Sequence, residues 1–392
     1  GAVGAHLDTE LKLRPLSVLA RHWWDDGSSL DLHADAARSA EAVGEFAGAA
    51  EARRFEAFCA QAREVYRTLE GPYIRGRMPG MLGLSARLGA RGMGVLAGLG
   101  PMTSLWRSLG RHFHDPRLRQ LFGRYATYTG SSPWQAPATL MLIAQVELDG
   151  VWSIDGGMHA LARCLERLAR SQGAVFRYHS ECARIQTEGG RVSGVLLASG
   201  ERLAADSVVF NGDVAALRGG LLGPQVQDSV PAKAQPRSLS ALTWSIHTPT
   251  SGLPLDRHNV FFRSDYESEF RDIFGRGQLP TQPTVYVCAQ DRGTGTVPEG
   301  AERLLCLVNA PPDGDIRHFT PTEIDACEAQ ALTLMKNCGL NLQLESASLV
   351  RTTPNDFNRL FPGTGGALYG RASHGWMTPF QRPSSSSALP GL

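Results

Sequence analysis

The side chains that could move protons are few in this sequence and are scattered along it. His112 and His114 stand beside Asp115, and such a cluster could serve acid–base chemistry. Polar residues directly before a helix are more often a helix cap, and we favour that interpretation here. Further candidates, either for orienting a hydroxyl group of a substrate or for structure, are Arg107, His258 and His374. None of these groups is a decisive proton acceptor.

Other reactive side chains do not form a site of a known type. No His, Cys, Asp and Glu residues have the spacing of metal ligands, so we predict no metal centre. The seven cysteines are far apart and none belongs to a Cys-x-x-Cys pair, which favours a reducing, cytoplasmic compartment. Four serines at 384–387 form a low-complexity run that is typical of a surface loop rather than of a nucleophile.

The composition is that of a folded chain with an ordinary core. Of the 392 residues, 42% are hydrophobic and 20% are charged, which excludes a disordered polypeptide. The formal net charge of +1 argues against an electrostatically bound partner, and we expect no nucleic-acid binding. This length favours two domains.

The first half of the chain is mainly helical by its apolar spacing. A strand pair is expected at 16–22 and 29–32, joined by an Asp-Asp-Gly turn. Helices are then expected at 34–69 and 116–126. From residue 150 a turn leads into a helix at 158–170, and strands follow around the turns at 189–190 and 199–200, ending at 208–210.

The region from 238 to 346 has the pattern of an antiparallel sheet with a covering helix. The expected strands are 241–247, 260–262, 284–289 and 304–310. A helix should begin at Thr320, with Pro321 in its first turn and Glu323 completing a capping box, and it should end at Gly339. Such a sheet would form the wall of a long apolar tunnel.

Several ordered segments together resemble one known family. The most distinctive are residues 352–357, 363–370 and 373–376 near the C-terminal end. Further segments in the same order are 13–16, 115–122, 150–152 with 156–158, 210–213 and 257–262. The chain resembles the bacterial-type phytoene desaturases, a family of FAD-dependent carotenoid desaturases, and within it the hydroxycarotenoid 3,4-desaturases, also called methoxyneurosporene dehydrogenases.

The resemblance implies an α/β fold of the amine-oxidase type, with two dinucleotide-binding domains. It implies an antiparallel-sheet substrate domain and a helical cap. We assign 1–149 to the helical, membrane-facing region, 150–220 to the FAD domain, 221–350 to the substrate domain and 351–392 to the return into the FAD domain. The family's N-terminal Gly-x-Gly-x-x-Gly unit is absent from this sequence. We therefore expect a chain that lacks both ends of its cofactor domain.

The resemblance also implies the cofactor and its contacts. FAD is expected, with the backbone at Cys182 facing the adenine, although the family commonly has valine at that position. The other expected contacts are Gly156, Gly157, Met158, Asn211 and Asp213. Family members differ at the acid–base positions near 85–88, where this chain offers only Arg87, so the catalytic base stays unassigned.

The implied activity is desaturation of an acyclic carotenoid, at the 3,4 bond of a hydroxylated or methoxylated end, in carotenoid biosynthesis. Alternatives are a phytoene desaturase, a carotenoid isomerase or oxygenase on the same scaffold, or a non-catalytic protein that binds apolar lipids. A quinone or oxygen would accept the electrons.

A membrane surface is a further expected partner. Residues 92–106 are apolar but shorter than the roughly 20 residues of a spanning helix. The wider segment 78–105 also contains Arg87 and Arg91, a composition typical of an interfacial segment, and a buried helical hairpin is the alternative. We expect a cytoplasmic protein that is peripheral on the inner membrane surface.

Overall fold

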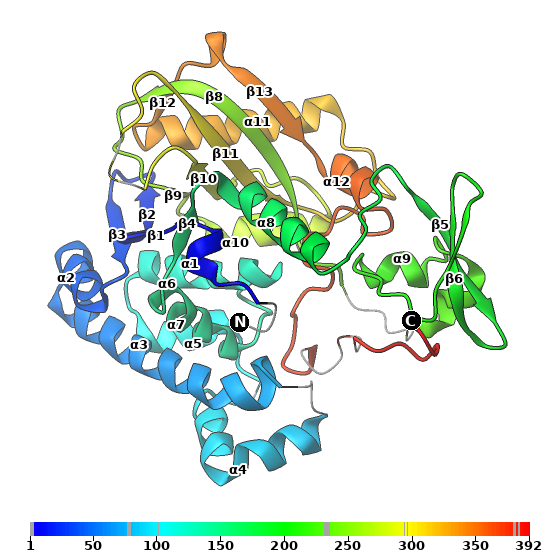
Figure 1. Cartoon of the computed structure of the whole chain (residues 1–392). Coiled ribbons are helices and arrows are strands. Elements are labelled where there is room, and N and C mark those ends of the chain that lie inside the picture. Colours follow the sequence, from blue (N-terminus) through cyan, green and yellow to red (C-terminus); the bar gives the residue numbers. More distant parts are fainter. Residues whose placement is uncertain are drawn as a thin grey trace.

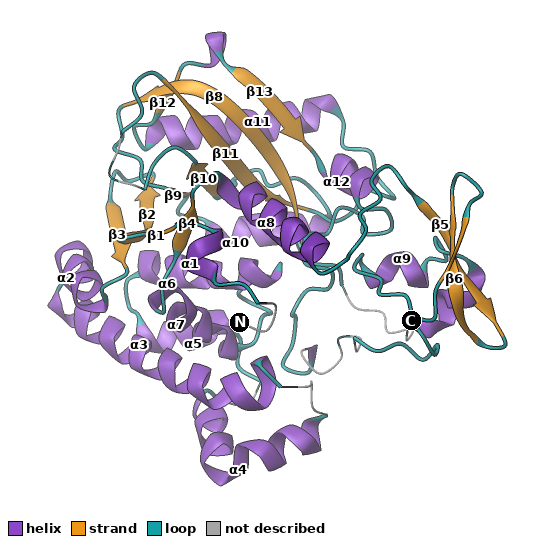
Figure 2. Cartoon of the chain, viewed as in Figure 1, coloured by secondary structure: helices purple, strands orange, loops and turns teal. Residues whose placement is uncertain are grey.

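The computed structural model describes residues 4–76, 80–100, 102–230, 236–293, 295, 297–378, 382 and 385–392. The main body contains a large sheet with helices on both faces, and a smaller lobe with its own sheet lies to one side (Figure 1). Figure 2 shows that many helices gather below the large sheet, where the first third of the chain folds. Three residues of the segments predicted above lie outside the described residues, namely Met78, Pro101 and Ser384.

The large sheet confirms the strands predicted from the alternating pattern. Its order is β12-β8-β11-β10-β9-β2-β3, and β13 also pairs with β8. All neighbours are antiparallel except β2 and β9, which are parallel. The strands are β2 (Val18–Trp24), β3 (Ser29–His33), β8 (Ser240–Ser251), β9 (His258–Phe262), β10 (Val285–Ala289), β11 (Ala301–Ala310), β12 (Asn341–Leu342) and β13 (Ser348–Thr352).

One face of this sheet is covered by α11 (Pro321–Asn337). Val285 and Val287 of β10 are fully buried in the core on this side, together with Leu334 of the helix. The predicted capping box is confirmed, because the Thr320 hydroxyl accepts a hydrogen bond from the Glu323 backbone and the Glu323 carboxylate accepts one from the Thr320 backbone. A local signal therefore fixes where this helix begins.

The opposite face packs against the N-terminal helices. Val260 and Phe262 point to this side, whereas Phe261 between them points to α11, as the period of two requires. The helices in this part of the chain are α2 (Ala36–Ala47), α3 (Ala49–Leu69), α4 (Met81–Gly98), α5 (Leu105–His112), α6 (Pro116–Gly123) and α7 (Ile143–Leu148). The phenylalanines of α3 lie in this core, which confirms that they are structural.

The helical tract predicted at 34–69 is confirmed, but it is not continuous. It is two helices, α2 and α3, that pack side by side and are separated at Gly48, whose φ of 93° only glycine adopts readily. The helix predicted at 116–126 is likewise shorter, since α6 ends at Gly123 and a 3₁₀ segment follows at Arg124–Thr129. That tightening places Arg124 and Tyr128 at the site described below.

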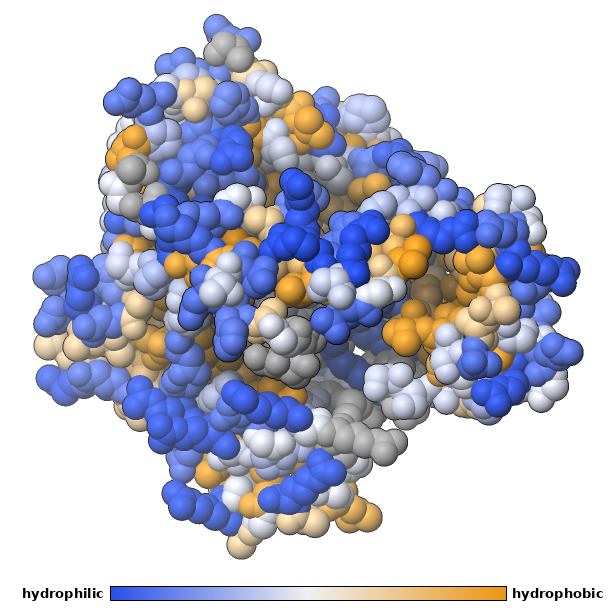
Figure 3. All heavy atoms as spheres, viewed as in Figure 1, coloured by the Kyte–Doolittle hydropathy of each residue, from blue (hydrophilic) through white to orange (hydrophobic). Residues whose placement is uncertain are grey.

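The smaller lobe carries β5 (Cys182–Glu188), β6 (Arg191–Leu197), β7 (Arg202–Ala204) and α9 (Val214–Arg218). The predicted strand meander is confirmed, but its predicted end at 208–210 is not a strand. Val209 there is 92% exposed, and Val175 is 83% exposed. Figure 3 shows apolar side chains gathered around a hollow beside this lobe, and a pocket of about 470 Å³ is lined by Val208, Phe210 and Leu217.

Short elements join the lobe to the main body. The N-terminal β1 (Leu13–Pro15) pairs with β4 (Trp152–Ile154), and α8 (Gly157–Ser171) follows β4 directly. The remaining helices are α1 (Leu7–Glu10), α10 (Tyr266–Phe270) and α12 (Pro354–Leu360).

Helix α4 projects from the bottom of the body in Figure 1. It is bent at Gly89, whose backbone is not helical (φ 61°, ψ −172°). Leu84 is buried, but Leu82 is 89% exposed. Among the described residues, no helix is long and apolar enough to cross a membrane.

Acid should destabilise this fold through His22. The side chain is 1% exposed, and its Nδ1 lies 3.1 Å from the Leu30 carbonyl oxygen. Burial, with a smaller contribution from the positive charge of Arg124, lowers the pKa of His22 to about 3. A lowered pKa in the folded state means that the stabilisation is complete above pH 6.5 and is lost as the pH falls towards 3.

We therefore expect His22→Gln, which can still donate to Leu30, to reduce the stability difference between pH 7.5 and pH 5.0 by about 2 kcal/mol. Urea denaturation at both pH values measures this difference. His159→Gln, at an exposed histidine of α8, is the matched control. An unchanged difference in His22→Gln would contradict the assignment.

Candidate active site

A pocket of about 390 Å³ lies between the sheet and the helices, and its sheet wall carries a histidine and a tyrosine. The Nδ1 atom of His258 lies 2.6 Å from the hydroxyl oxygen of Tyr286 on the neighbouring strand. Burial lowers the pKa of His258 to about 4 and raises the pKa of Tyr286 well above its usual value. At neutral pH the imidazole is therefore uncharged and the phenol keeps its proton. The two groups share one hydrogen bond, and the tautomer of the imidazole sets its direction.

The helical wall of the same pocket carries a charged network. Arg124 donates to the hydroxyl of Tyr128 at 2.9 Å, and its guanidinium lies 5.1 Å from the centre of that ring. The Glu147 carboxylate accepts hydrogen bonds from Tyr128 at 2.7 Å and from Tyr125 at 2.6 Å. Burial alone would lower the pKa of Arg124, but Tyr128 and Glu147 raise it, so the guanidinium stays charged.

Two donors of this pocket are buried without a partner in the described part of the chain. They are Nε of Arg124 and the hydroxyl of Tyr266. Tyr266 is only 5% exposed. Buried polar groups in native proteins are almost always hydrogen-bonded, so a bound ligand or an ordered water molecule would supply the missing acceptor.

Behind the pocket lies a fully buried carboxyl group. Glu269 accepts hydrogen bonds from the Thr284 backbone at 3.0 Å and from the Asn309 side chain at 2.7 Å. Burial raises the pKa of Glu269 to about 7, against the lowering effect of these bonds. Because Thr284 and Asn309 line the pocket and Glu269 does not, the carboxyl group positions the wall rather than facing a ligand.

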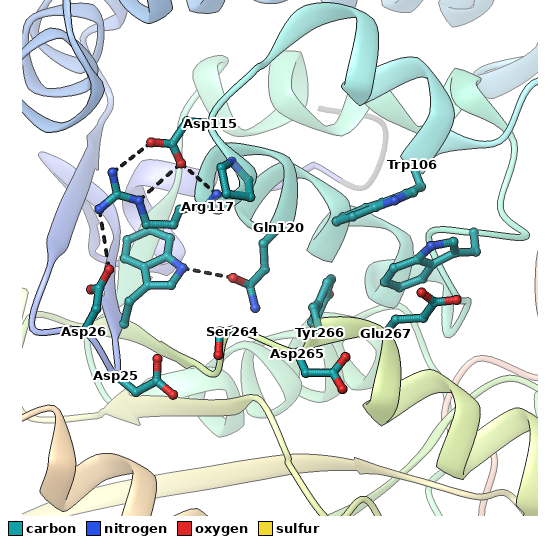
Figure 4. Close-up of a pocket in the computed structure, with 13 residues that line it drawn as sticks. Asp25, Asp26, Trp106, Asp115, Arg117, Gln120, Ser264, Asp265, Tyr266 and Glu267 are labelled. Atoms are coloured by element: carbon teal, nitrogen blue, oxygen red, sulfur yellow. Dashed lines mark hydrogen bonds and ion pairs between the residues drawn. The ribbon is translucent and has the colours of Figure 1, made fainter.

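Tyr266 also lines a second, larger pocket of about 690 Å³ (Figure 4). Two of its polar lining residues, Arg117 and Gln120, are already paired. Arg117 pairs with Asp115 at 2.8 Å and with Asp26 at 3.7 Å, and Gln120 bonds to Trp24 and to the Arg263 carbonyl. This pocket therefore has less chemistry to offer than the one at His258.

An apolar pocket of about 360 Å³ lies beside α4. Leu69, Leu84, Leu88 and Leu96 are among its lining residues, and Trp376 from the C-terminal segment also faces it. The long tunnel predicted from the sequence stays a prediction.

The structure separates the predicted proton-handling residues. Of the three further candidates, only His258 lines the central pocket. Arg107 is exposed on α5. The Nε2 atom of His374 accepts a hydrogen bond from the Ser132 backbone at 3.1 Å, and its ring packs edge-on against Phe274, so this residue anchors the C-terminal segment.

The cluster around residue 112 is structural, as we favoured. Asp115 caps α6 by accepting from the Arg117 backbone. The ring of His112 packs against Phe58 at 5.4 Å, and the His114 backbone donates to Glu51.

The predicted flavin contacts lie in three places rather than in one cluster. Gly156, Gly157 and Met158 are at the start of α8, and Cys182 opens β5 in the lobe. Figure 1 shows α8 running from the side of β4 towards that lobe. Asp213 caps α9, and its carboxylate faces Gly370 in the segment predicted to return to the FAD domain, while Asn211 is exposed nearby. Their roles in cofactor binding stay predictions.

Comparison with known proteins identifies the family. Residues 107–383 match the family model of the flavin-containing amine oxidoreductases. A hydroxyneurosporene desaturase of Rubrivivax gelatinosus is 57% identical over the whole chain and 75% of its own length. A protein of the same name from Cereibacter sphaeroides is 44% identical over 99% of this chain and 78% of its own length.

This chain belongs to the flavin-containing amine oxidoreductases, and within them to the carotenoid desaturases. A 1-hydroxycarotenoid 3,4-desaturase of a Flavobacterium species is 34% identical over 69% of this chain and 56% of its own length. The predicted amine-oxidase-type α/β fold and the predicted FAD cofactor are confirmed by this membership.

The start of α8 fits a phosphate group of FAD. No side chain caps this fifteen-residue helix, and a Cβ atom at Gly157 would meet nothing within 4 Å. The backbone N–H groups of the first turn are thus accessible, and together with the helix dipole they favour an anion. Gly156 and Gly157 both have positive φ angles, so these positions favour glycine.

The sequence did not reveal most of the central pocket. Arg124, Tyr128, Glu147, Tyr266 and Tyr286 were not singled out because no motif joins them. The one available signal was the spacing of four between Arg124 and Tyr128, which is common on helix surfaces.

A glycine substitution can test the assignment at α8. Gly157→Ala should raise the dissociation constant for FAD at least about tenfold, because a methyl group at a positive φ angle disturbs the turn that presents the N–H groups. Gly190→Ala is the matched control, since Gly190 has a φ of 79° against 75° and equally open surroundings. Flavin content after gel filtration measures the effect, and equal flavin loss in both variants would refute a specific contact.

Proposed function

We propose that this protein introduces the 3,4 double bond into an acyclic carotenoid that carries a hydroxyl or methoxyl group at C-1, as a step of carotenoid biosynthesis. The observation that carries this proposal is the 57% identity to a hydroxyneurosporene desaturase along the entire chain. The central pocket supports it, because apolar residues such as Leu19 and Leu307 share the lining with hydrogen-bonding groups. An apolar molecule with one polar end suits such a lining.

The reaction removes two hydrogens from adjacent carbon atoms that have no activating group beside them. No protein side chain accepts a hydride, and FAD when bound supplies that acceptor. The second hydrogen leaves as a proton. The chain itself has to hold the polyene in register and to exclude water from the reacting carbons.

His258 is better suited to hydrogen bonding than to taking this proton. A general base works best when its pKa is near the working pH. The pKa of His258, lowered by burial to about 4, lies about three units below neutrality. We therefore assign the imidazole to the polar wall of the pocket, where it is hydrogen-bonded to Tyr286.

The electrons must pass onward after each turnover, and we propose a quinone or oxygen as their acceptor. A membrane quinone would be available if the protein lies on the bilayer, which is also where a carotenoid dissolves. Exposing even half of a forty-carbon polyene to water would cost on the order of 15 kcal/mol. Direct transfer from the bilayer avoids this cost.

We propose α4 as the membrane contact of a cytoplasmic, peripheral protein. Exposed apolar side chains, Leu82 at 89%, Met93 at 42% and Met102 at 72%, lie on or beside the helix. Arg87 and Arg91 of the same helix are also exposed and suit anionic headgroups. The apolar pocket beside α4 then offers the substrate a way out of the bilayer.

The proposed reaction can be tested with the full-length, FAD-loaded enzyme and 1-hydroxyneurosporene in vesicles with a quinone. We expect a product lighter by two hydrogens, with longer-wavelength absorption and the new double bond at C-3,4. Product at another position, or from phytoene instead, would favour the other members of the family. Absence of any desaturated carotenoid would overturn the proposal.

Membrane contact predicts a specific loss of vesicle binding. Leu82→Asp with Met93→Asp should weaken binding to anionic vesicles at least about tenfold, because two apolar side chains are replaced by charges that the bilayer repels. Leu165→Asp is the matched control, at a leucine of α8 that is 58% exposed. Co-sedimentation measures binding, and equal losses in both proteins would contradict a role for α4.

A further inference from the structure

The central pocket contains two hydrogen-bond donors that the protein itself does not use. Nε of Arg124 and the hydroxyl of Tyr266 are buried without a partner in the described residues, and both side chains line this pocket. Removing a polar group from water without a new hydrogen bond is unfavourable. Two such donors in one pocket therefore indicate a ligand with an oxygen acceptor.

Tyr266 is held in place by its ring rather than by its hydroxyl. The ring packs edge-on against Phe262 at 6.0 Å and against Phe270 at 5.1 Å. Trp106 and Trp134 contact it from the side of the larger pocket, at 6.2 and 5.7 Å (Figure 4 shows Tyr266 and Trp106). The hydroxyl is thus fixed before any ligand binds.

Arg124 is also fixed in advance, and its charge is balanced. Its contact with Tyr128 and the two tyrosine bonds to Glu147 determine the position of the guanidinium. Because a carboxylate stands in the same pocket lining, an anionic ligand would meet a negative charge as well as a positive one. A neutral oxygen, such as that of an alcohol or ether, fits this balance better than a carboxylate or a phosphate.

We propose that Arg124 and Tyr266 receive the oxygen at C-1 of the substrate and thereby determine the preference for hydroxylated over unmodified acyclic carotenoids. This inference rests on the proposed function and adds the residues that select the substrate. The reacting bond at C-3,4 begins two bonds from the oxygen-bearing carbon. An oxygen held here therefore fixes the register of a polyene that could otherwise slide along apolar walls.

The test compares two substrates in the full-length, FAD-loaded enzyme, 1-hydroxyneurosporene and neurosporene. In Tyr266→Phe, which keeps the ring contacts, kcat/KM for the hydroxylated substrate should fall about 10- to 100-fold, since one specific hydrogen bond is lost. The value for neurosporene should stay the same. Arg124→Lys keeps the charge but lacks Nε, and the ratio of the two substrates should move in the same direction.

Two further measurements separate binding from folding. Carotenoids quench tryptophan fluorescence, and two of the seven tryptophans lie beside Tyr266, so quenching measures binding. The dissociation constant for 1-hydroxyneurosporene should rise in both variants. Tyr66→Phe is the matched control, because the hydroxyl of this α3 residue bonds to Glu70, directly after the end of the helix, and Tyr66 does not line the central pocket. Mass spectrometry of the products shows whether loss of the hydrogen bond to the C-1 oxygen also leads to double bonds at several positions.

Equal losses on both substrates, or an unchanged ratio, would overturn the inference. So would loss of flavin from correctly folded Tyr266→Phe, which would assign these donors to the cofactor. A wild-type enzyme that desaturates both substrates equally would refute the selection but leave the desaturase function intact. A wild-type enzyme that desaturates neither would refute the proposed function instead.

Discussion

The strict alternation of side chains along the large sheet is the constraint on which the site depends. On β10 the residues that face α11 are apolar, while Tyr286 and, on β9, His258 face the opposite side, into the pocket. β8 and β11 pair from Ala301 opposite Pro249 to Ala310 opposite Ser240, which leaves little freedom for a different register. If the register of these strands shifted by one residue, the imidazole and the phenol would point into the core between the sheet and α11. Valines would then line the pocket.

The helical wall imposes a second requirement, because it brings a cation into a nearly dry environment. Arg124 is tolerated there since Tyr128 and Glu147 raise its pKa against the effect of burial. The same low-polarity surroundings keep His258 neutral and raise the pKa of Glu269 to about 7. The pocket therefore presents a cation balanced by the hydrogen-bonded Glu147 carboxylate, together with neutral polar groups. This combination suits recognition of a neutral oxygen more than proton transfer by a side chain.

Local signals in the sequence predicted the elements that local interactions determine. Six strands of the large sheet and the capping box at Thr320 were predicted because alternation and capping need only neighbouring residues, whereas β12 and β13 were not predicted. The break at Gly48 was missed because the segment has helical composition on both sides and the turn is required only by the packing of α2 on α3. The extended segment at 208–210 was expected to be a strand from its apolar composition, which does not show whether a partner strand is present.

The site was predicted less well than the fold for a related reason. His258 was a candidate on residue type alone, but its environment comes from Tyr286, 28 residues away, and from helices more than 100 residues earlier. Tyr125 donates a hydrogen bond to Glu147, which is 22 residues away in the sequence. The rings of Tyr266 and Trp134 are in contact although these residues are even further apart in the sequence. Only the family resemblance connected such distant segments, and it did so for the cofactor rather than for the polar wall of the substrate pocket.

In the function that we propose, the two pockets would divide the work of recognising an amphipathic polyene. The lining beside α4 is mostly aliphatic and can attract any long apolar chain, with an energy that grows with buried area but does not depend on position along the chain. Such a surface gives affinity without register. The donors at Arg124 and Tyr266 occur at one point and need an acceptor, so they can fix position while adding little apolar contact. A desaturase acting beside an oxygenated carbon needs both properties, because affinity alone would let the reacting bond slide past the flavin, and a polar anchor alone would not draw the molecule out of the bilayer.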